Sequence, residues 1–218
     1  LGHEARAIDL PGAGADVTPL TEVTLASYAD AILADLAANP GPTVVVGHSA
    51  GGFAITEAAE RDPTHFARLI YLCAYVPVSG KGLVQMRKSA PRDLLGGAFE
   101  LAGDRRAFRF TQAALRDNVY DGAPAQKFDK ALERLSWQPM QPQVTPVTET
   151  GRSAGLPKSA VVCAGDRVIP PEHQRAMAAG FGPDNIHVFP TGHAPMAVDP
   201  AGLAQLIAQI SADVPPSG

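Results

Sequence analysis

Two hydrophobic patterns alternate along this chain, and each predicts a different kind of element. Apolar side chains recur every three or four positions from residue 24 to residue 38, which predicts a helix that Asn39-Pro40-Gly41 ends. Short apolar runs predict strands, and the run over residues 43–47 is typical of the middle of a parallel sheet. The other predicted strands cover residues 4–10, 68–76, 159–164 and 185–190, and the other predicted helices cover residues 51–61, residues 172–179 and a last helix capped by Asp199.

Strands that alternate with helices indicate an α/β fold with a mostly parallel, doubly wound sheet. The alternation stops between residues 79 and 156, where Gly, Pro and charged residues surround two amphipathic stretches near residues 108–118 and 125–135. The sequence QPMQPQVTPV, which follows them, is expected to be extended. Because this segment is too long for a loop, it predicts a lid at residues 79–156, inserted between core parts 1–78 and 157–218.

Composition and charge narrow the class of protein further. The 218 residues suit one large α/β domain or a domain with an inserted lid, and a net charge of −4 argues weakly against nucleic acid or an anionic membrane as a partner. No apolar run approaches the ~18 residues of a membrane helix, and no signal peptide is recognisable. Cys73 and Cys163 lack the spacing of a metal or redox pair, so we expect two free, buried thiols in a cytoplasmic protein.

The sequence VVVGHSAGGF places a serine between a predicted strand and a predicted helix. It matches G-x-S-x-G, the nucleophile elbow, in which a strained strand-to-helix turn exposes the serine hydroxyl. We expect Gly47 and Gly51 to relieve crowding by neighbouring elements, and Ala50 and Gly52 to keep the start of the helix slim. Ser49 is therefore the candidate nucleophile, and the backbone N–H of Ala50 is a candidate donor to the oxyanion.

A serine nucleophile needs a base and an orienting acid, which follow it in the order Ser, acid, His in this kind of fold. His193 is the candidate base, because it follows a late predicted strand at the edge where an open sheet places its chemistry. His48, by contrast, occupies only the variable position of the elbow. Asp166 is the candidate acid since it also follows a strand, whereas Asp184 precedes one; an ordinary loop carboxylate is the alternative for Asp166.

These three residues predict acyl transfer without a metal or a cofactor. His193 would take the proton of Ser49 as the serine attacks an ester carbonyl, Asp166 would stabilise the imidazolium, and water would release the acyl group. The sequence GAGADV lacks the third glycine of a dinucleotide fingerprint, and no His/Cys/Asp cluster has metal-ligand spacing. The expected partner is thus a small-molecule ester, and a homodimer is possible.

With these residues assigned, the chain resembles the α/β-hydrolase superfamily, and within it the branch of salicylate-type methyl esterases, hydroxynitrile lyases and their bacterial relatives. The resemblance rests on RAIDLPGAG, VVVGHSAGGFAITEAAE, IYLCAYVP, AGDRVIPPEHQRAM and TGHAPMAVDP, which span nearly the whole chain outside the lid. It implies an esterase, because lyases of the branch carry a lysine directly after the catalytic histidine, where this chain has Ala194. A carbon–carbon lyase and a non-catalytic ligand-binding protein remain the alternatives.

The resemblance also implies a strand and an H-G-containing loop that supplies the second oxyanion donor. In the family this strand lies between the strands that match residues 4–10 and 43–47, and the sequence does not contain it. We therefore expect an N-terminal strand and helix of about 30 residues to be missing, which would leave two strands without their shared partner; a naturally incomplete relative is the alternative.

The lid is expected to hold the substrate against the edge of the sheet. Its apolar residues Phe110, Leu115 and Trp137 are candidates for the walls of a substrate pocket. Packing in the core of the lid is the favoured role for any one of them.

Overall fold

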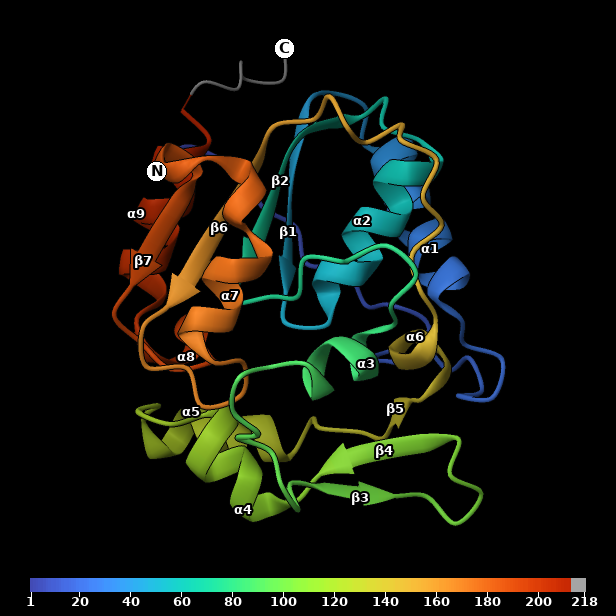
Figure 1. Cartoon of the computed structure of the whole chain (residues 1–218), viewed down its shortest axis with the longest axis vertical. Helices are drawn as coiled ribbons and strands as arrows, with labels where there is room; N and C mark the ends of the chain where they lie inside the picture. Colours follow the sequence, from blue (N-terminus) through green and yellow to red (C-terminus); the bar gives the residue numbers. More distant parts are fainter. Residues whose placement is uncertain (213–218) are drawn as a thin grey trace.

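The structure, a computed structural model, describes residues 1–212, and its centre is a four-stranded parallel sheet (Figure 1). The strands are β1 (Thr43–His48), β2 (Phe66–Leu72), β6 (Lys158–Cys163) and β7 (Ile186–Phe189), in the order β1-β2-β6-β7. Every neighbouring pair in this sheet is parallel, so the carboxyl ends of the strands share one edge. That edge is where an α/β sheet of this kind carries its chemistry.

Helices cover both faces of the sheet. Successive side chains of a strand point to opposite faces, so an apolar strand needs a helix on each face to bury them. The helices of the core are α1 (Leu25–Ala38), α2 (Gly51–Arg61), α7 (Pro171–Met177), α8 (Pro195–Val198) and α9 (Pro200–Ile210). Tyr71 of β2 packs with α1 and α2. The next residue, Leu72, packs with α9 on the other face. Both faces are therefore buried, as the continuous apolar run of this strand predicts.

The predicted helix boundaries agree closely with the structure. Thr24 caps α1 by accepting the N–H of Ser27 at 3.0 Å, and Asp199 caps α9 by accepting the N–H of Gly202 at 2.9 Å. Helix α2 covers the predicted range, residues 51–61. The starts of α1 and α9 follow from local capping chemistry, which the sequence carries.

Two strand predictions are wrong in ways that concern the edge of the sheet. Residues 4–10 are not a strand: they are almost entirely exposed, and within residues 1–212 no strand lies beside them to complete a ladder. The strand predicted for the middle of the sheet, β1, lies at its edge, where Val46 is 37% exposed. An apolar run indicates that both faces of a strand are buried, but it does not indicate the position of the strand in the sheet.

Two other segments differ from their predicted conformation. Strand β2 ends at Leu72 instead of continuing to residue 76, because Cys73 has a φ of 33°, which turns the chain out of the sheet. The sequence QPMQPQVTPV begins with β5 (Gln138–Pro139) but then forms α6 (Gln141–Val144), so it is only partly extended. Pro142 is compatible with this helix because it lies in the first turn, where its missing N–H is not needed.

The chain between β2 and β6 forms a small antiparallel sheet and several short helices. Its elements are α3 (Leu83–Lys88), β3 (Phe99–Leu101), β4 (Ala107–Phe110), α4 (Gln112–Ala114), a π-helical turn (Leu115–Val119), α5 (Ala125–Leu132), β5 and α6. Figure 1 shows β3, β4, α4 and α5 beyond the end of the sheet to which β6 points. The division at residues 79 and 156 stays a prediction, and we call residues 79–156 the lid segment.

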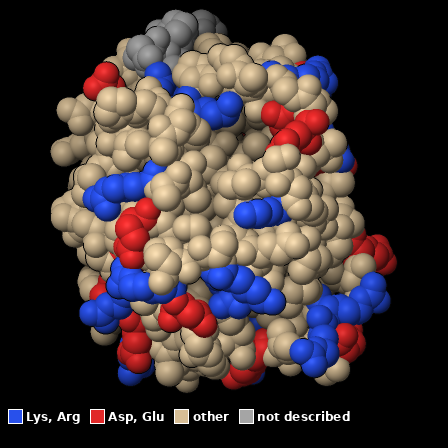
Figure 2. Space-filling model, viewed as in Figure 1, with Lys and Arg blue, Asp and Glu red and all other residues tan. Residues whose placement is uncertain are grey.

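Within residues 1–212, no helix combines the length and the apolar character that a membrane crossing requires. On the face that Figure 2 shows, Lys and Arg side chains are interspersed with Asp and Glu side chains.

Candidate active site

Ser49 lies at the turn between β1 and α2, and its backbone is strained. Its φ of 55° is in the left-handed region that non-glycine residues rarely adopt. The turn is held by β2 and the residues after it: the N–H of Ser49 donates to the carbonyl oxygen of Leu72, and the carbonyl oxygen of Ser49 accepts the N–H of Tyr75, both at 3.2 Å. This is the geometry of a nucleophile elbow, with the serine held away from regular structure.

The glycines around Ser49 are needed at different places than predicted. A β-carbon on Gly47 would lie 2.7 Å from the carbonyl oxygen of Gly51, so this position is crowded as expected. Nothing lies within 4 Å of a β-carbon on Gly51 itself, so the crowding predicted there is absent. The crowded position is Gly52, where a β-carbon would overlap the carbonyl oxygen of Tyr75. The backbone that follows β2 therefore approaches the second residue of α2, not the first.

The structure brings Ser49, His193 and Asp166 into direct contact. Nε2 of His193 lies 2.9 Å from Oγ of Ser49, and Nδ1 of His193 lies 2.8 Å from Oδ2 of Asp166. His193 and Asp166 are buried, whereas Ser49 is half-buried and thus accessible to a ligand. Asp184, the rejected acid, is exposed in the turn Pro183–Asn185 before β7.

Asp166 is surrounded by hydrogen-bond donors that orient both of its oxygens. Oδ1 accepts the backbone N–H groups of Val168 at 2.7 Å and Ile169 at 2.9 Å. Oδ2 accepts the side-chain amide of Gln174 at 2.8 Å, in addition to its contact with His193. A buried carboxylate needs such partners, because without them its charge would be very unfavourable there.

Gln174 is a site residue that sequence reasoning missed. It is 3% exposed, and its amide also donates to the carbonyl oxygen of Ile169 at 2.8 Å while its oxygen accepts the N–H of Cys163 at 3.2 Å. The sequence marks Gln174 only by its place in AGDRVIPPEHQRAM, on the predicted helix that follows Asp166. That stretch supported the family resemblance without pointing to a role for the glutamine.

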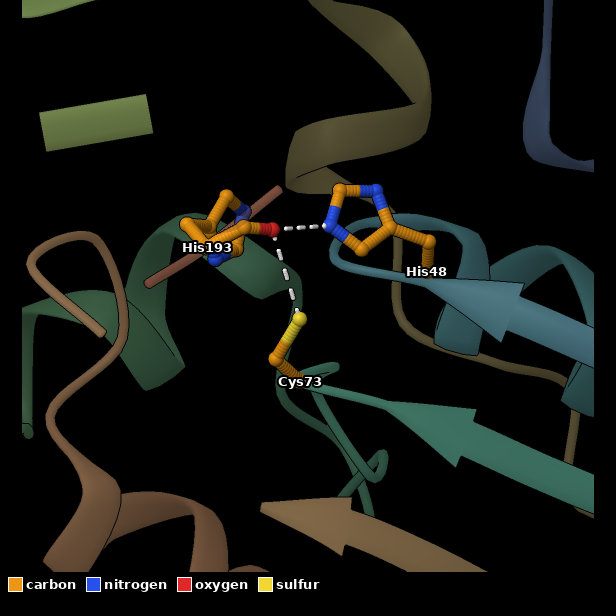
Figure 3. Close-up of side chains that lie close together, drawn as sticks. All are labelled: His48, Cys73 and His193. Carbon is orange, nitrogen blue, oxygen red and sulfur yellow. Dashed lines mark hydrogen bonds between the residues drawn. The ribbon is translucent and has the colours of Figure 1, made fainter. Parts of the chain in front are cut away.

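His48 and Cys73 both lie against the backbone of His193 (Figure 3). Nε2 of His48 is 2.7 Å from the carbonyl oxygen of His193, and Sγ of Cys73 is 3.4 Å from the same oxygen. One ring nitrogen of each histidine and Sγ of Cys73 lie within 4.8 Å of one another, a grouping that could hold a metal ion. Here His48 and Cys73 face a carbonyl oxygen, and the ring nitrogens of His193 face Ser49 and Asp166, so hydrogen bonding accounts for the grouping.

The N–H of Ala50 takes part in no hydrogen bond within residues 1–212. Ala50 is the residue directly before α2 and follows Ser49, so its N–H is one of the unpaired groups at a helix start. Such a group is free to receive a developing negative charge, and its role as an oxyanion donor stays a prediction.

An apolar cluster lies between the sheet and the lid segment, beside Ser49 and Asp166; we call it the lid-side cluster. Its buried members are Leu25, Phe53, Tyr75, Leu83, Met86, Leu95, Ala98, Ala114, Val147, Val168 and Ile169, and Ala50, Phe99, Phe110, Val119 and Met177 pack against them. Because Ala50 adjoins the serine and Val168 and Ile169 follow the aspartate closely, this cluster forms an apolar wall next to the candidate site. A separate hollow, lined by Leu156, Lys158 and Phe181, lies at the opposite end of β6 and is not part of the site.

The three predicted pocket residues lie within the lid segment. Phe110 packs against the lid-side cluster, with its ring centroid 4.7 Å from that of Phe99. Leu115 is buried at the start of the π-helical turn. Trp137 is half-buried, and Cζ of the Arg109 guanidinium lies 4.6 Å from the centroid of the Trp137 ring. Their role as pocket walls stays a prediction.

A parallel sheet with a serine elbow, a histidine and an aspartate at its carboxyl edge defines a protein of the α/β-hydrolase class. The model of the "Alpha/beta hydrolase family" matches residues 1–206, so the chain belongs to this family. Methylesterase 10 of Arabidopsis thaliana is 30% identical over 97% of this chain and 82% of its own length. The pyrethroid hydrolase of Sphingobium wenxiniae is 30% identical over 98% of this chain and 79% of its own length.

Solved structures agree with this family assignment. The pyrethroid hydrolase PytH with BIF superimposes with a TM-score of 0.79 at 27% identity, over 95% of this chain and 85% of its own. Polyneuridine aldehyde esterase has a TM-score of 0.84 at 19% identity, over 96% and 89% of the two chains, which shows a common fold. The relatives are thus the esterases and hydrolases that the resemblance predicted.

Proposed function

We propose that the protein hydrolyses small carboxylic esters through an acyl-enzyme formed on Ser49. The observation that carries this proposal is the distance of 2.9 Å between Oγ of Ser49 and Nε2 of His193, with Asp166 behind the imidazole. A serine hydroxyl becomes a nucleophile when a neighbouring imidazole can take its proton. The buried carboxylate keeps the imidazole in the tautomer that has its free nitrogen toward the serine.

The reaction proceeds in two matched halves. Oγ of Ser49 attacks the ester carbonyl carbon as His193 takes the hydroxyl proton, and the tetrahedral intermediate then expels the alcohol, to which His193 returns the proton. In the second half, His193 takes a proton from water, which attacks the acyl carbon, and the carboxylic acid leaves as Oγ regains its proton. The N–H of Ala50 supplies one hydrogen bond to the oxyanion in both halves.

Apolar, uncharged esters suit the site best. The lid-side cluster presents apolar side chains next to Ser49 and Asp166, and Phe110 belongs to its margin. Phe110, Leu115 and Trp137 wall the acyl or alcohol pocket in this proposal. The names of two relatives, a methylesterase and a pyrethroid hydrolase, are consistent with ester substrates of this kind.

A cytoplasmic location is part of the proposal. Cys73 and Cys163 are both free thiols in the buried core, as is usual where the compartment is reducing. The absence of a nucleic-acid partner stays a prediction from the net charge of −4, and the homodimer stays a prediction without a sequence feature behind it.

Labelling with a fluorophosphonate, followed by turnover of p-nitrophenyl acetate, tests the proposal. We expect mass spectrometry to find the adduct on Ser49, and Ser49→Ala to lose both the adduct and at least about 10³-fold in kcat. Ser79→Ala, at an exposed serine of the lid segment, is the matched control and should behave as wild type.

Three outcomes would contradict this proposal. Equal turnover by Ser49→Ala would remove Ser49 from the mechanism. Cleavage of cyanohydrins without ester hydrolysis would indicate the carbon–carbon lyase. Binding of esters without labelling or turnover by the wild type would indicate a non-catalytic ligand-binding protein.

A further inference from the structure

His48 and Cys73 take no part in the proton transfers proposed above, yet their side chains meet at one atom next to the site. That atom is the backbone carbonyl oxygen of His193 (Figure 3). We propose that His48 and Cys73 are positioning residues, which anchor the backbone of His193 so that its imidazole keeps its contacts with Ser49 and Asp166. This inference rests on the proposed esterase function.

The first argument is the origin of the two donors. His48 is the last residue of β1 and directly precedes Ser49, and Cys73 directly follows β2. The same two strands hold the serine, since the N–H of Ser49 bonds to the carbonyl oxygen of Leu72 at 3.2 Å. The donors therefore tie the histidine to the rigid frame of its nucleophile, so a shift of one would carry the other with it.

The second argument is the state of the chain around His193. The loop after β7 is held as far as Thr191, whose carbonyl oxygen accepts the N–H of Gly165 at 2.9 Å. Helix α8 begins only at Pro195, which has no N–H. Within residues 1–212, both hydrogen bonds to the His193 carbonyl oxygen come from side chains. Those two bonds consequently hold the middle of the segment that carries the imidazole.

The third argument is the protonation of the two donors. Desolvation of the ring, together with the neighbouring His193, lowers the pKa of His48 to about 4, so His48 is neutral at pH 7. Since a carbonyl oxygen can only accept, the single proton of His48 is on Nε2. Burial raises the pKa of Cys73, which keeps its thiol protonated and able to donate. At neutral pH both side chains therefore carry a proton that they can donate to the carbonyl oxygen.

A neutral donor also suits the charge that develops on His193. The rings of His48 and His193 have centroids 4.8 Å apart at an interplanar angle of 45°. A second positive charge at that distance would oppose formation of the imidazolium in the transition state. An uncharged ring at this position supports the histidine without that repulsion.

The test compares variants that remove a donor with variants that keep one. His48→Met removes the N–H at similar volume, and His48→Gln retains an amide donor. Because misplacing a reacting group by about 1 Å can cost about 10²-fold, we expect kcat for p-nitrophenyl acetate to fall at least about tenfold in His48→Met with little change in KM, and to recover in His48→Gln. Cys73→Ala should lower kcat less than His48→Met does, since a thiol is a weak donor. Cys73→Ser keeps a donor and should recover the kcat of the wild type.

His187→Met is the matched control, because His187 is a half-buried histidine of β7, the strand that leads to the His193 loop. It should keep wild-type kcat. Melting temperatures of all variants identify any that merely lose stability, and the milder Cys73→Ala and Cys73→Ser pair carries the test if His48→Met does not fold.

A second readout does not depend on turnover. The proton on Nδ1 of His193, which faces Asp166, should give a resolved NMR signal in the full chain, and this signal should move or broaden in His48→Met and remain in His48→Gln. Wild-type kcat with an unchanged signal in His48→Met would overturn the inference, as would a His48→Gln variant that is as impaired as His48→Met. If the wild type hydrolyses no ester, the proposed function fails, while the NMR comparison still decides whether His48 positions His193.

Discussion

The side-chain amide of Gln174 donates a hydrogen bond of 2.8 Å to Oδ2 of Asp166, the same oxygen that faces Nδ1 of His193. The amide is itself fixed, because it donates to the carbonyl oxygen of Ile169 and accepts the N–H of Cys163. Helix α7 therefore reaches the acid of the site through one glutamine. The carboxylate cannot rotate away from the imidazole without breaking this arrangement.

We expect Gln174→Leu to lower kcat about tenfold and to destabilise the fold. The leucine would leave the Cys163 N–H and the Ile169 carbonyl oxygen without this partner, and each unpaired buried group costs about 1–3 kcal/mol. Urea denaturation measures the stability, and p-nitrophenyl acetate turnover measures kcat. Gln205→Leu, at an exposed position of α9, is the control. A Gln174→Leu variant with unchanged kcat would show that Asp166 does not depend on the amide.

Replacing Asp166 by asparagine tests the assignment of the acid. Asp166→Asn keeps the size of the side chain but presents an amide to Nδ1 of His193, which favours the wrong imidazole tautomer, so we expect kcat to fall by about 10³–10⁴-fold. Asp184→Asn, at the exposed carboxylate that also precedes His193 in the chain, should keep wild-type kcat. A reversed result, with Asp184→Asn impaired and Asp166→Asn active, would move the acid to Asp184.

The two glycines after Ala50 should respond in opposite ways to alanine. In Gly52→Ala the new methyl group would overlap the carbonyl oxygen of Tyr75, so the elbow must shift; we expect a loss of at least about 2 kcal/mol in stability and a lower kcat. Gly51→Ala meets nothing within 4 Å and lies in a helix, so it should fold as well as the wild type or better by about 0.5–1 kcal/mol. Thermal denaturation of the two variants compares them directly, and equal losses would contradict the geometry.

Glu60 ties the end of the lid segment to the helix that starts at the elbow. It is a buried residue of α2, and its carboxylate accepts the backbone N–H and the hydroxyl of Thr150, both at 2.8 Å, and the hydroxyl of Ser153. Burial alone would raise the pKa of Glu60, but the hydrogen bonds from Ser153 and Thr150 outweigh it and lower the pKa to about 2.

This lowered pKa predicts a loss of stability in acid. A carboxyl group whose pKa is lower in the folded state stabilises the fold above its unfolded pKa of 4.5, and the contribution is lost as the pH falls toward about 2. We expect the urea midpoint of the wild type to fall between pH 4.5 and pH 2 more steeply than that of Glu60→Gln. Glu149→Gln, at an exposed residue of the same segment, should keep the wild-type slope. Parallel curves for Glu60→Gln and the wild type would refute the contribution of Glu60.

Most of the candidate site could be predicted from the sequence because each residue is marked by its position relative to a strand. Ser49 follows one strand, Asp166 another and His193 a third, and parallel strands bring their carboxyl ends to one edge. The supporting residues could not be predicted in this way. Gln174 and His48 have no distinguishing pattern in the sequence, since their roles depend on which atom they meet.

Local chemistry along the chain was enough to predict the helices α1, α2 and α9, the two side-chain caps and the serine turn. Capping by Thr24 and Asp199 and the elbow around Ser49 involve residues a few positions apart, so the amino-acid order carries the information. Strand order is different, because a ladder needs a partner that is distant in sequence. The edge position of β1 and the absence of a strand at residues 4–10 were decided by those partners alone.

Tertiary structure also decided what surrounds the reacting groups. The approach of Tyr75 to Gly52 and the meeting of His48 and Cys73 at the His193 carbonyl oxygen join residues that are 23 to 145 positions apart in the chain. Hydrogen bonds and close packing act over a few ångströms in space, whatever the separation in sequence. The sequence by itself therefore determined which residues could react, and the packing of the strands and loops around them determined how they are held.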